Sequence, residues 1–223
     1  MKNINKSCLD RITWDMPGTE IEKESFRRIE AEADKKGLIG DEWIVARRLI
    51  HTTADFSIAD DLIFASDPFS AIRCALEEGA AVYSDSNMIK SGISVAKLKI
   101  FNKDYSRDSI HCYIAERDIV EAAKAANTSR ALASVEKAKS MLHGSVVLIG
   151  NAPLALAGIV RLAIEEGICP AALIGMPVGF VNVVEAKELL MQTDIPFITI
   201  RGRRGGSPLA VASLHAVMEN RTG

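Results

Sequence analysis

Three short, uninterrupted apolar runs dominate the C-terminal part of this 223-residue chain. They alternate with segments of helical spacing, in the order 146–149 (apolar run), 153–166 (helical), 171–174 (apolar run), 181–192 (helical), 197–200 (apolar run) and 208–220 (helical). Strands that are buried on both faces consist of continuous apolar residues, and strand–helix–strand units connect parallel neighbours. The pattern therefore predicts an α/β protein with a mainly parallel or mixed sheet of about five strands, flanked by helices on both faces.

Residues 1–145 show these patterns less regularly. Residues 1–18 lack periodicity and are expected to form an irregular arm, followed by a helix that Thr19 and Glu22 open with a capping box. Short strands are expected at 80–83, 95–101 and 110–114, helices at 68–79, 116–126 and 129–142, and a short helix or turn at 85–92. Because no linker or internal repeat interrupts the sequence, residues 1–223 are expected to form a single domain.

The charge balance limits the partners that this chain can have. Its formal net charge is -2, whereas binding to a nucleic acid or to an anionic membrane surface requires a basic face. The longest apolar stretch, 146–164, is interrupted by Asn151, Pro153 and Arg161, which favours a buried strand leading into a helix over a membrane span. We therefore expect no nucleic-acid or membrane partner, and we expect any anionic partner to be a small molecule.

The cysteines and the N-terminal residues indicate the cellular compartment in which the protein is expected to act. The four cysteines are scattered along the sequence, at Cys8, Cys74, Cys112 and Cys169. Their spacing lacks the Cys and His pairs of a zinc site and the regular framework of a disulfide-rich secreted domain. The N-terminal residues also lack the apolar run of a secretory signal. We expect reduced thiols, no metal bound by the protein, and a cytoplasmic location.

Residues 44–55, with the sequence IVARRLIHTTAD, concentrate polar chemistry on one predicted helix. Wound at 3.6 residues per turn, Arg47, His51 and Asp55 follow one another at i, i+4 and i+8 on one face. The apolar stripe of the same helix lies on another face and comprises Trp43, Ala46, Leu49, Ile50 and Thr53. Two interpretations stay open at this point: a solvated polar face, or an acid/base histidine between cations that faces an anionic ligand.

Glycine-rich loops follow the three apolar runs of the C-terminal part, at 150–153, 175–180 and 201–207. The carboxyl ends of parallel strands share one edge of a sheet, where ligands bind. Glycine permits close approach of the backbone, and each following helix offers free N–H groups to an anion. Glycine also suits tight turns without any ligand, but three such loops at one edge, the last with Arg201, Arg203 and Arg204, predict a site for a ligand with several carboxylates.

Other catalytic patterns are weaker. Ser207 has no histidine and acid placed to form a triad, so an oxyanion-binding or helix-capping role is favoured. His111, His143 and His215 have structural explanations as core, helix-ending and packing residues. The phosphate-loop and dinucleotide motifs are absent, which disfavours a nucleotide-dependent enzyme without excluding it.

Taken in order, the motifs of this chain resemble those of the precorrin-8X methylmutase family of cobalamin biosynthesis, which includes cobalt-precorrin-8 methylmutases. The resemblance covers nearly the whole chain. Its motifs are Glu24-Ser25-Phe26, residues 48–55, residues 85–88 with Gly92, Ser129-Arg130, and residues 149–153, 175–181, 185–188 and 202–207.

This resemblance implies an isomerase that moves a methyl group between neighbouring carbons of ring C in a contracted tetrapyrrole. The reaction is a 1,5-sigmatropic shift that yields hydrogenobyrinate or its cobalt form. The resemblance further implies an α/β sheet flanked by helices, a homodimer with its active site at the subunit interface, and no organic cofactor, although the substrate itself can carry cobalt. A nucleotide-dependent α/β enzyme and a non-catalytic tetrapyrrole carrier stay as alternatives.

The resemblance also assigns roles to individual residues. His51 matches the catalytic histidine, which is expected to protonate or hydrogen-bond a ring nitrogen, and Ser25 and Arg130 match residues that line the substrate site. The remaining residues expected to bind substrate are Arg47, Arg48, Thr52, Asp85, Asn151, Gly179, Arg203, Arg204 and Ser207. A substrate with a ring of acetate and propionate groups would explain why an acidic chain concentrates arginines near its glycine-rich loops.

Four positions depart from the usual family pattern. Ala54 stands where glycine is common after His-Thr-Thr, and Leu154 where threonine is frequent. Ala186 replaces a serine before lysine, and Ser129 replaces a threonine before Arg130. None of these departures removes the histidine or an arginine, so the expected reaction stays the same.

Overall fold

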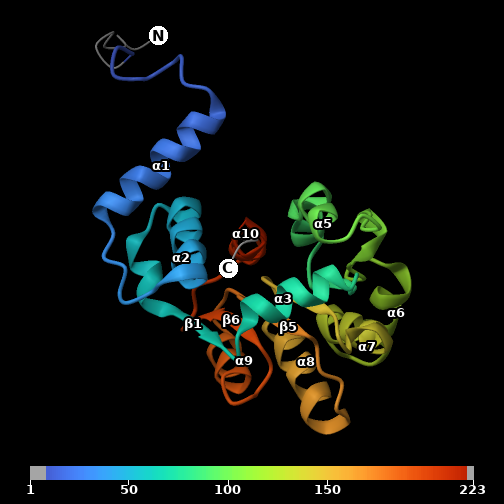
Figure 1. The fold of residues 1–223 in the computed structure, drawn as a ribbon. Coiled ribbons are helices and arrows are strands. Elements are labelled where there is room, and N and C mark those ends of the chain that lie inside the picture. The colour runs from blue at the N-terminus through green and yellow to red at the C-terminus, as the bar shows by residue number, and fades with distance from the viewer. Residues whose placement is uncertain (1–8, 220–223) are drawn as a thin grey trace, which may run out of the picture. The chain divides into compact units, whose positions relative to one another are not determined.

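The computed structural model describes residues 9–219, which divide into two compact units at Asp34 and Lys35. The first unit contains α1 (Gly18–Glu32), and the second contains the sheet and the other helices (Figure 1). Residues 9–17 form neither helix nor strand, as expected for an irregular arm, whereas residues 1–8 lie outside the described part. The assignment of residues 1–223 to one domain stays a prediction.

The beginning of α1 differs from the expected capping box. The helix starts at Gly18, and its N-cap is Pro17, whose carbonyl oxygen accepts the N–H groups of Glu20 and Ile21. No side chain caps this end. Thr19 therefore lies inside the first turn, because the fixed φ of Pro17 lets the helix begin two residues earlier than predicted.

Within residues 9–219, six strands form one sheet in the order β1-β6-β5-β4-β2-β3. The strands are β1 (Leu62–Ala65), β2 (Val82–Ser84), β3 (Ile110–His111), β4 (Val146–Ile149), β5 (Ala172–Gly175) and β6 (Phe197–Ile200). All neighbouring pairs are parallel except β1 and β6. This confirms the mainly parallel α/β class. The unpredicted strand is β1, a half-buried edge strand without the fully buried pattern that identified the central ones.

One predicted strand is wrong: residues 95–101 form a helix, α5 (Val95–Phe101). The short stretch VAKLKIF alternates polar and apolar residues, so its pattern fits either structure. The side chain of Ser94 caps the helix by accepting the N–H of Lys97 at 3.3 Å. Leu98 and Phe101, three residues apart, are then both buried, which a strand would not allow on one face.

The other helices lie close to their predicted positions. They are α2 (Gly40–Thr53), α3 (Pro68–Glu77), α4 (Asn87–Gly92), α6 (Arg117–Ala125), α7 (Arg130–Leu142), α8 (Pro153–Glu166), α9 (Val183–Leu190) and α10 (Ser207–Glu219), with short 3-10 helices η2 (Phe56–Asp61) and η3 (Arg107–Ser109). Helices α3 and α10 pack on one face of the sheet, and α7, α8 and α9 form the layer on the other face (Figure 1).

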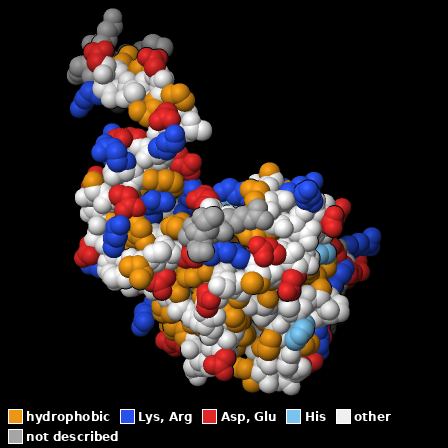
Figure 2. Space-filling view, in the orientation of Figure 1, with side chains coloured by type: hydrophobic (Ala, Val, Ile, Leu, Met, Phe, Trp, Pro, Cys, Tyr) orange, Lys and Arg blue, Asp and Glu red, His pale blue; other side chains and the backbone are white. Residues whose placement is uncertain are grey.

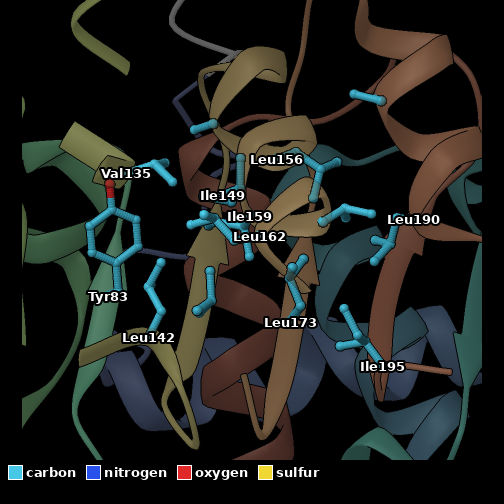
Figure 3. Close-up of a cluster of buried hydrophobic side chains, with 14 of the residues drawn as sticks. Tyr83, Val135, Leu142, Ile149, Leu156, Ile159, Leu162, Leu173, Leu190 and Ile195 are labelled. Atoms are coloured by element: carbon cyan, nitrogen blue, oxygen red, sulfur yellow. The ribbon is translucent and has the colours of Figure 1, made fainter. Parts of the chain in front are cut away.

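The core on the second face shows why this arrangement is stable (Figure 3). Alternate strand residues such as Ile149 and Leu173 point to this face and meet Leu156 and Ile159 of α8 and Leu190 of α9. All five side chains are fully buried. Each contributes about 1.5–3 kcal/mol of hydrophobic stabilisation, which fixes the strands and their C-terminal loops relative to one another.

The strand order changes direction between β2 and β4 at the carboxyl edge of the sheet. The connection after β2 runs to β3 on one side, whereas the connection after β4 runs to β5 on the other side. Loops that diverge in this way open a ligand-binding crevice between neighbouring strands. The loops after β2 and β4 begin at Asp85 and Gly150, two positions inside the predicted motifs.

No helix within residues 9–219 combines the length and apolar character needed to cross a membrane. On the face of the molecule shown in Figure 2, acidic and basic side chains are interspersed.

Candidate active site

Helix α2 presents His51 in its last turn. Trp43, Ala46, Leu49 and Ile50 are buried, as the predicted apolar stripe requires, whereas its last predicted member, Thr53, is exposed. The side chain of His51 is exposed on the other side of the helix. The structure thus confirms that His51 points away from the face that holds α2 in place.

The predicted position of Asp55 on the same helix face is wrong. Helix α2 ends at Thr53 because Ala54 adopts the left-handed conformation, with φ 53° and ψ 28°. Asp55 instead begins η2, where its carboxylate accepts hydrogen bonds from the N–H and the hydroxyl of Ser57 at 3.0 and 2.7 Å. These bonds lower the pKa of Asp55, and Arg204, whose Nη1 lies 3.4 Å from the carboxylate, adds to the effect.

A pocket of about 390 Å³ lies beside His51 and is called the histidine pocket here. Its walls come from α2, α4 and α10, and its lining residues are Arg48, His51, Thr52, Met88, Gly92, Ser207, Pro208, Val211, Ala212 and His215. Four of the predicted site residues therefore meet in one cavity, although they come from parts of the sequence more than 150 residues apart.

An ion-pair cluster holds the wall formed by Arg48. Its Nη2 lies 2.5 Å from Oε1 of Glu219, and Nζ of Lys97 lies 2.8 Å from the same oxygen. Burial raises the pKa of Glu219, but the hydrogen bonds from both cations outweigh it and leave the pKa below its ordinary value. The cluster joins α2, α5 and α10 and carries one net positive charge.

Asp85 connects the loop after β2 to the loop after β4. Its side chain is 1% exposed, and its carboxylate accepts the backbone N–H groups of Gly150, Asn151 and Ala152 at 3.0, 2.8 and 2.6 Å. Burial raises the pKa of Asp85, and these three N–H groups oppose that shift. The contact of Asp85 with substrate stays a prediction, whereas its contacts here position the exposed Asn151.

The same loops meet the start of α10. The hydroxyl groups of Ser86 and Ser207 lie 2.9 Å apart. Gly150 packs so closely on Ser207 that a Cβ atom at Gly150 would lie 2.7 Å from the Cα atom of Ser207. The glycine is therefore required by a close approach of two backbones, which places Ser207 in the pocket wall.

The third glycine-rich loop, residues 201–206, is called the arginine loop. Its Gly206 N–H donates to the carbonyl oxygen of Met176 at 2.8 Å, and the N–H of Gly179 donates to the carbonyl oxygen of Arg203 at 3.4 Å. The guanidinium of Arg203 also lies 5.4 Å from the ring centre of Phe180, which is 84% exposed. Hydrogen bonds thus join the loops after β5 and β6, and Ser207 follows directly after the second of these loops.

Within the described part of the chain, Arg47 and Arg130 do not line the histidine pocket; Arg47 is half-buried on α2, and Arg130 is exposed at the start of α7. Ser25 belongs to the first unit, where its hydroxyl donates to the carbonyl oxygen of Ile21 at 2.8 Å.

The structure adds residues that the sequence motifs did not identify. His215 was expected to be a packing residue, yet it lines the pocket together with Val211. A helical repeat could have revealed it, because Ser207, Val211 and His215 follow one another at i, i+4 and i+8 on α10.

The fold and the site define an α/β enzyme whose histidine-lined pocket lies next to glycine- and arginine-rich loops. The sequence profile of the precorrin-8X methylmutase family matches residues 20–220. The chain therefore belongs to the precorrin-8X methylmutase family, which confirms the resemblance of its motifs and the expected isomerase class.

Individual proteins agree with this assignment. A Leptospira interrogans protein named cobalt-precorrin-8 methylmutase is 40% identical over 210 residues, which cover 90% of this chain and 93% of that protein. A Pseudomonas aeruginosa protein named precorrin-8X methylmutase is 35% identical over 212 residues, covering 94% and 99%. The crystal structure of precorrin-8X methylmutase from Thermus thermophilus matches with a TM-score of 0.82 and 41% identity, covering 91% of this chain and 96% of that one.

Proposed function

We propose that this protein converts precorrin-8 or cobalt-precorrin-8 into hydrogenobyrinate or its cobalt form by moving one methyl group on ring C. The observation that carries the proposal is the histidine pocket, in which His51, Arg48, Thr52 and Ser207 meet in a member of the methylmutase family. The rearrangement breaks one carbon–carbon bond and forms another at the neighbouring carbon, so no atom enters or leaves the substrate.

His51 is the proposed acid/base residue. It donates a proton or a hydrogen bond to a ring nitrogen, which draws electron density from the ring while the methyl group migrates, and the proton returns when the shift is complete. Imidazole groups suit this exchange because they gain and lose protons near neutral pH. The exposed position of His51 at the pocket leaves it accessible to a substrate.

The remaining predicted residues are proposed to bind and orient the substrate. Guanidinium groups bind carboxylates through paired hydrogen bonds, and glycine-rich backbone can approach an anion closely. The residues with this proposed role are Ser25, Arg47, Arg48, Thr52, Asp85, Arg130, Asn151, Gly179, Arg203, Arg204 and Ser207. Holding the macrocycle in one orientation would account for much of the rate enhancement, because the shift needs no nucleophile.

We further propose that the reaction uses no organic cofactor, since a sigmatropic shift transfers no electrons between molecules. The relatives include proteins named for the cobalt-containing and for the cobalt-free substrate, so both compounds belong in the assay. Cys74, Cys112 and Cys169 are free thiols, which supports the proposed cytoplasmic location.

A homodimer with its active site at the subunit interface is also proposed. It is supported by the predicted role of Arg130, which does not line the histidine pocket within residues 9–219 of one chain. Light scattering would test the dimer against the 24.2 kDa chain mass. Arg130→Ala should chiefly weaken substrate binding. If His51 and Arg130 act from different subunits, mixing the His51→Ala and Arg130→Ala proteins at a low substrate concentration should give more activity than either protein alone, whereas two sites within single chains would give no such gain.

The function is tested by adding precorrin-8, or cobalt-precorrin-8 under anaerobic conditions, and recording the visible absorption spectrum with time. The expected result is a change to the product spectrum, with identical mass. Binding without any change would indicate a carrier and contradict the proposal. A requirement for ATP or a nicotinamide nucleotide would contradict it as well and favour a nucleotide-dependent enzyme.

A further inference from the structure

His215 is a second histidine in the wall of the histidine pocket. It lies on α10 and is half-buried, whereas His51 lies on α2 and is exposed. The two imidazole groups therefore line one cavity from different helices and in different surroundings. The reaction proposed above uses one proton and thus one histidine, which leaves His215 without an assigned role.

One ring nitrogen of His215 is already occupied. The backbone N–H of Ser94, at the start of α5, donates a hydrogen bond to Nε2 of His215 at 3.2 Å. An imidazole nitrogen that accepts a hydrogen bond carries no proton, so the proton of the neutral ring lies on Nδ1. Ser94 thus fixes His215 as the Nδ1–H form.

The second ring nitrogen is accessible. Within residues 9–219, the structure gives Nδ1 of His215 no hydrogen-bond partner, and Nδ1 is not a buried atom. Since His215 lines the pocket, Nδ1–H is the donor that this side chain can offer to a bound molecule.

The surroundings keep this donor neutral. Burial lowers the pKa of His215 to about 4, the charges of Lys97 and Arg48 act in the same direction, and Glu219 opposes them. A neutral ring near the net positive cluster of Arg48, Lys97 and Glu219 is suited to meet an anionic oxygen.

We propose that His215 is a substrate-binding residue whose Nδ1–H donates a hydrogen bond to a peripheral carboxylate of the tetrapyrrole in the histidine pocket. The proposal rests on the proposed function and adds a contact to it. The competing explanation is structural: His215 only accepts the Ser94 N–H and holds α5 against α10.

Two substitutions separate these roles, because each side chain reproduces the hydrogen-bonding group of only one ring nitrogen. In His215→Asn the side-chain amide occupies the position of Nδ1 and can still donate, whereas the bond to Ser94 is lost. In His215→Gln the amide reaches the position of Nε2 and can still accept the Ser94 N–H, whereas the Nδ1 donor is lost.

The readouts are KM and kcat for the methyl shift, with thermal unfolding as a control for folding. The expected result is a KM raised about tenfold in His215→Gln, the loss that follows from one hydrogen bond to a charged acceptor. The kcat should stay within about twofold, and His215→Asn should keep a KM within about threefold of the wild type while melting at a lower temperature. A wild-type KM in His215→Gln, or equal losses in both variants, would overturn the proposal.

A measurement on the wild-type protein covers the case in which a variant does not fold. The ¹⁵N resonance of Nδ1, assigned through bonds from the His215 backbone in ¹³C,¹⁵N-labelled wild-type protein, should shift when hydrogenobyrinate is added. An unchanged resonance at saturation would overturn the proposal. If the wild type binds but does not convert precorrin-8, the proposed function fails, whereas conversion together with an unresponsive His215 contradicts the inference alone.

Discussion

The ammonium group of Lys187 donates a 2.8 Å hydrogen bond to the carbonyl oxygen of Gly202, although the lysine side chain is 1% exposed. A second bond of 2.5 Å reaches the carbonyl oxygen of Arg204. Lys187 lies on α9, so these bonds attach the arginine loop to a helix in the layer of α7, α8 and α9. A buried cation thus determines where the exposed Arg203 and Arg204 can lie.

Replacing Lys187 with methionine should therefore loosen the arginine loop. Two carbonyl oxygens would lose their donor, and we expect KM for the tetrapyrrole to rise by about tenfold with a smaller change in kcat. Steady-state kinetics would check this. Lys139→Met is the matched control, because Lys139 pairs with Glu166 at the surface and should leave KM unchanged. Equal KM values in the two variants would contradict the positioning role.

The buried state of Lys187 also predicts a pH dependence of stability. Burial lowers its pKa from 10.5 to about 8, so between these values the unfolded chain binds more protons than the folded one. Stability then rises with pH across this window, by about 3 kcal/mol at most. Urea unfolding at pH 8 and pH 10 should show this rise for the wild type and a smaller one for Lys187→Met. An equal change in the free energy of unfolding between pH 8 and pH 10 in the two proteins would mean that Lys187 does not titrate in this range.

Two glycines of the arginine loop should respond differently to alanine. At Gly205, with φ +159°, a Cβ atom would lie 2.5 Å from the carbonyl oxygen of Pro177 and would also overlap that of Met176. We expect Gly205→Ala to cost about 3 kcal/mol and to reduce activity. Gly202 has φ +71° and open space around it, so Gly202→Ala should cost about 1 kcal/mol. Chemical denaturation measures both, and the reverse order would contradict the loop packing.

A glycine at position 54 should stabilise the folded protein. The left-handed conformation of Ala54 ends α2 and is strained for alanine, so Ala54→Gly should raise the free energy of unfolding by about 1 kcal/mol. The same substitution at Ala122, exposed within α6, should lower it by about the same amount, because glycine weakens a helix interior. Urea midpoints of both variants test the prediction, which fails if both changes have the same sign.

Removal of the His51 side chain should stop the reaction without preventing binding. We expect His51→Ala to reduce the rate of conversion by about a hundredfold or more, the range for loss of a positioned acid/base group. Absorbance titration should still detect bound tetrapyrrole. His143→Ala is the control, since His143 is exposed at the end of α7, outside the pocket lining. Wild-type turnover by His51→Ala would remove His51 from the mechanism.

The sequence by itself determined the α/β class, the positions of most helices and the family. All four residues of the apolar run 146–149 are buried. A strand covered on both faces needs such a continuous apolar run, so the run itself identifies a central strand. The same reasoning showed that His51 points away from the buried stripe of α2. It failed at 95–101 and at β1, where short segments fit two patterns and packing decides between them.

Tertiary structure alone decided which side chains share a site. His51 and His215 lie 164 positions apart in the sequence, and they line one pocket because α10 packs against α2 and α4. Likewise, the charge of Lys187 suggests a solvated side chain, yet long-range packing buries it against the arginine loop. Periodicity records only which face of an element is buried, whereas a pocket depends on how faces from distant segments meet, and that is fixed by packing across the whole fold.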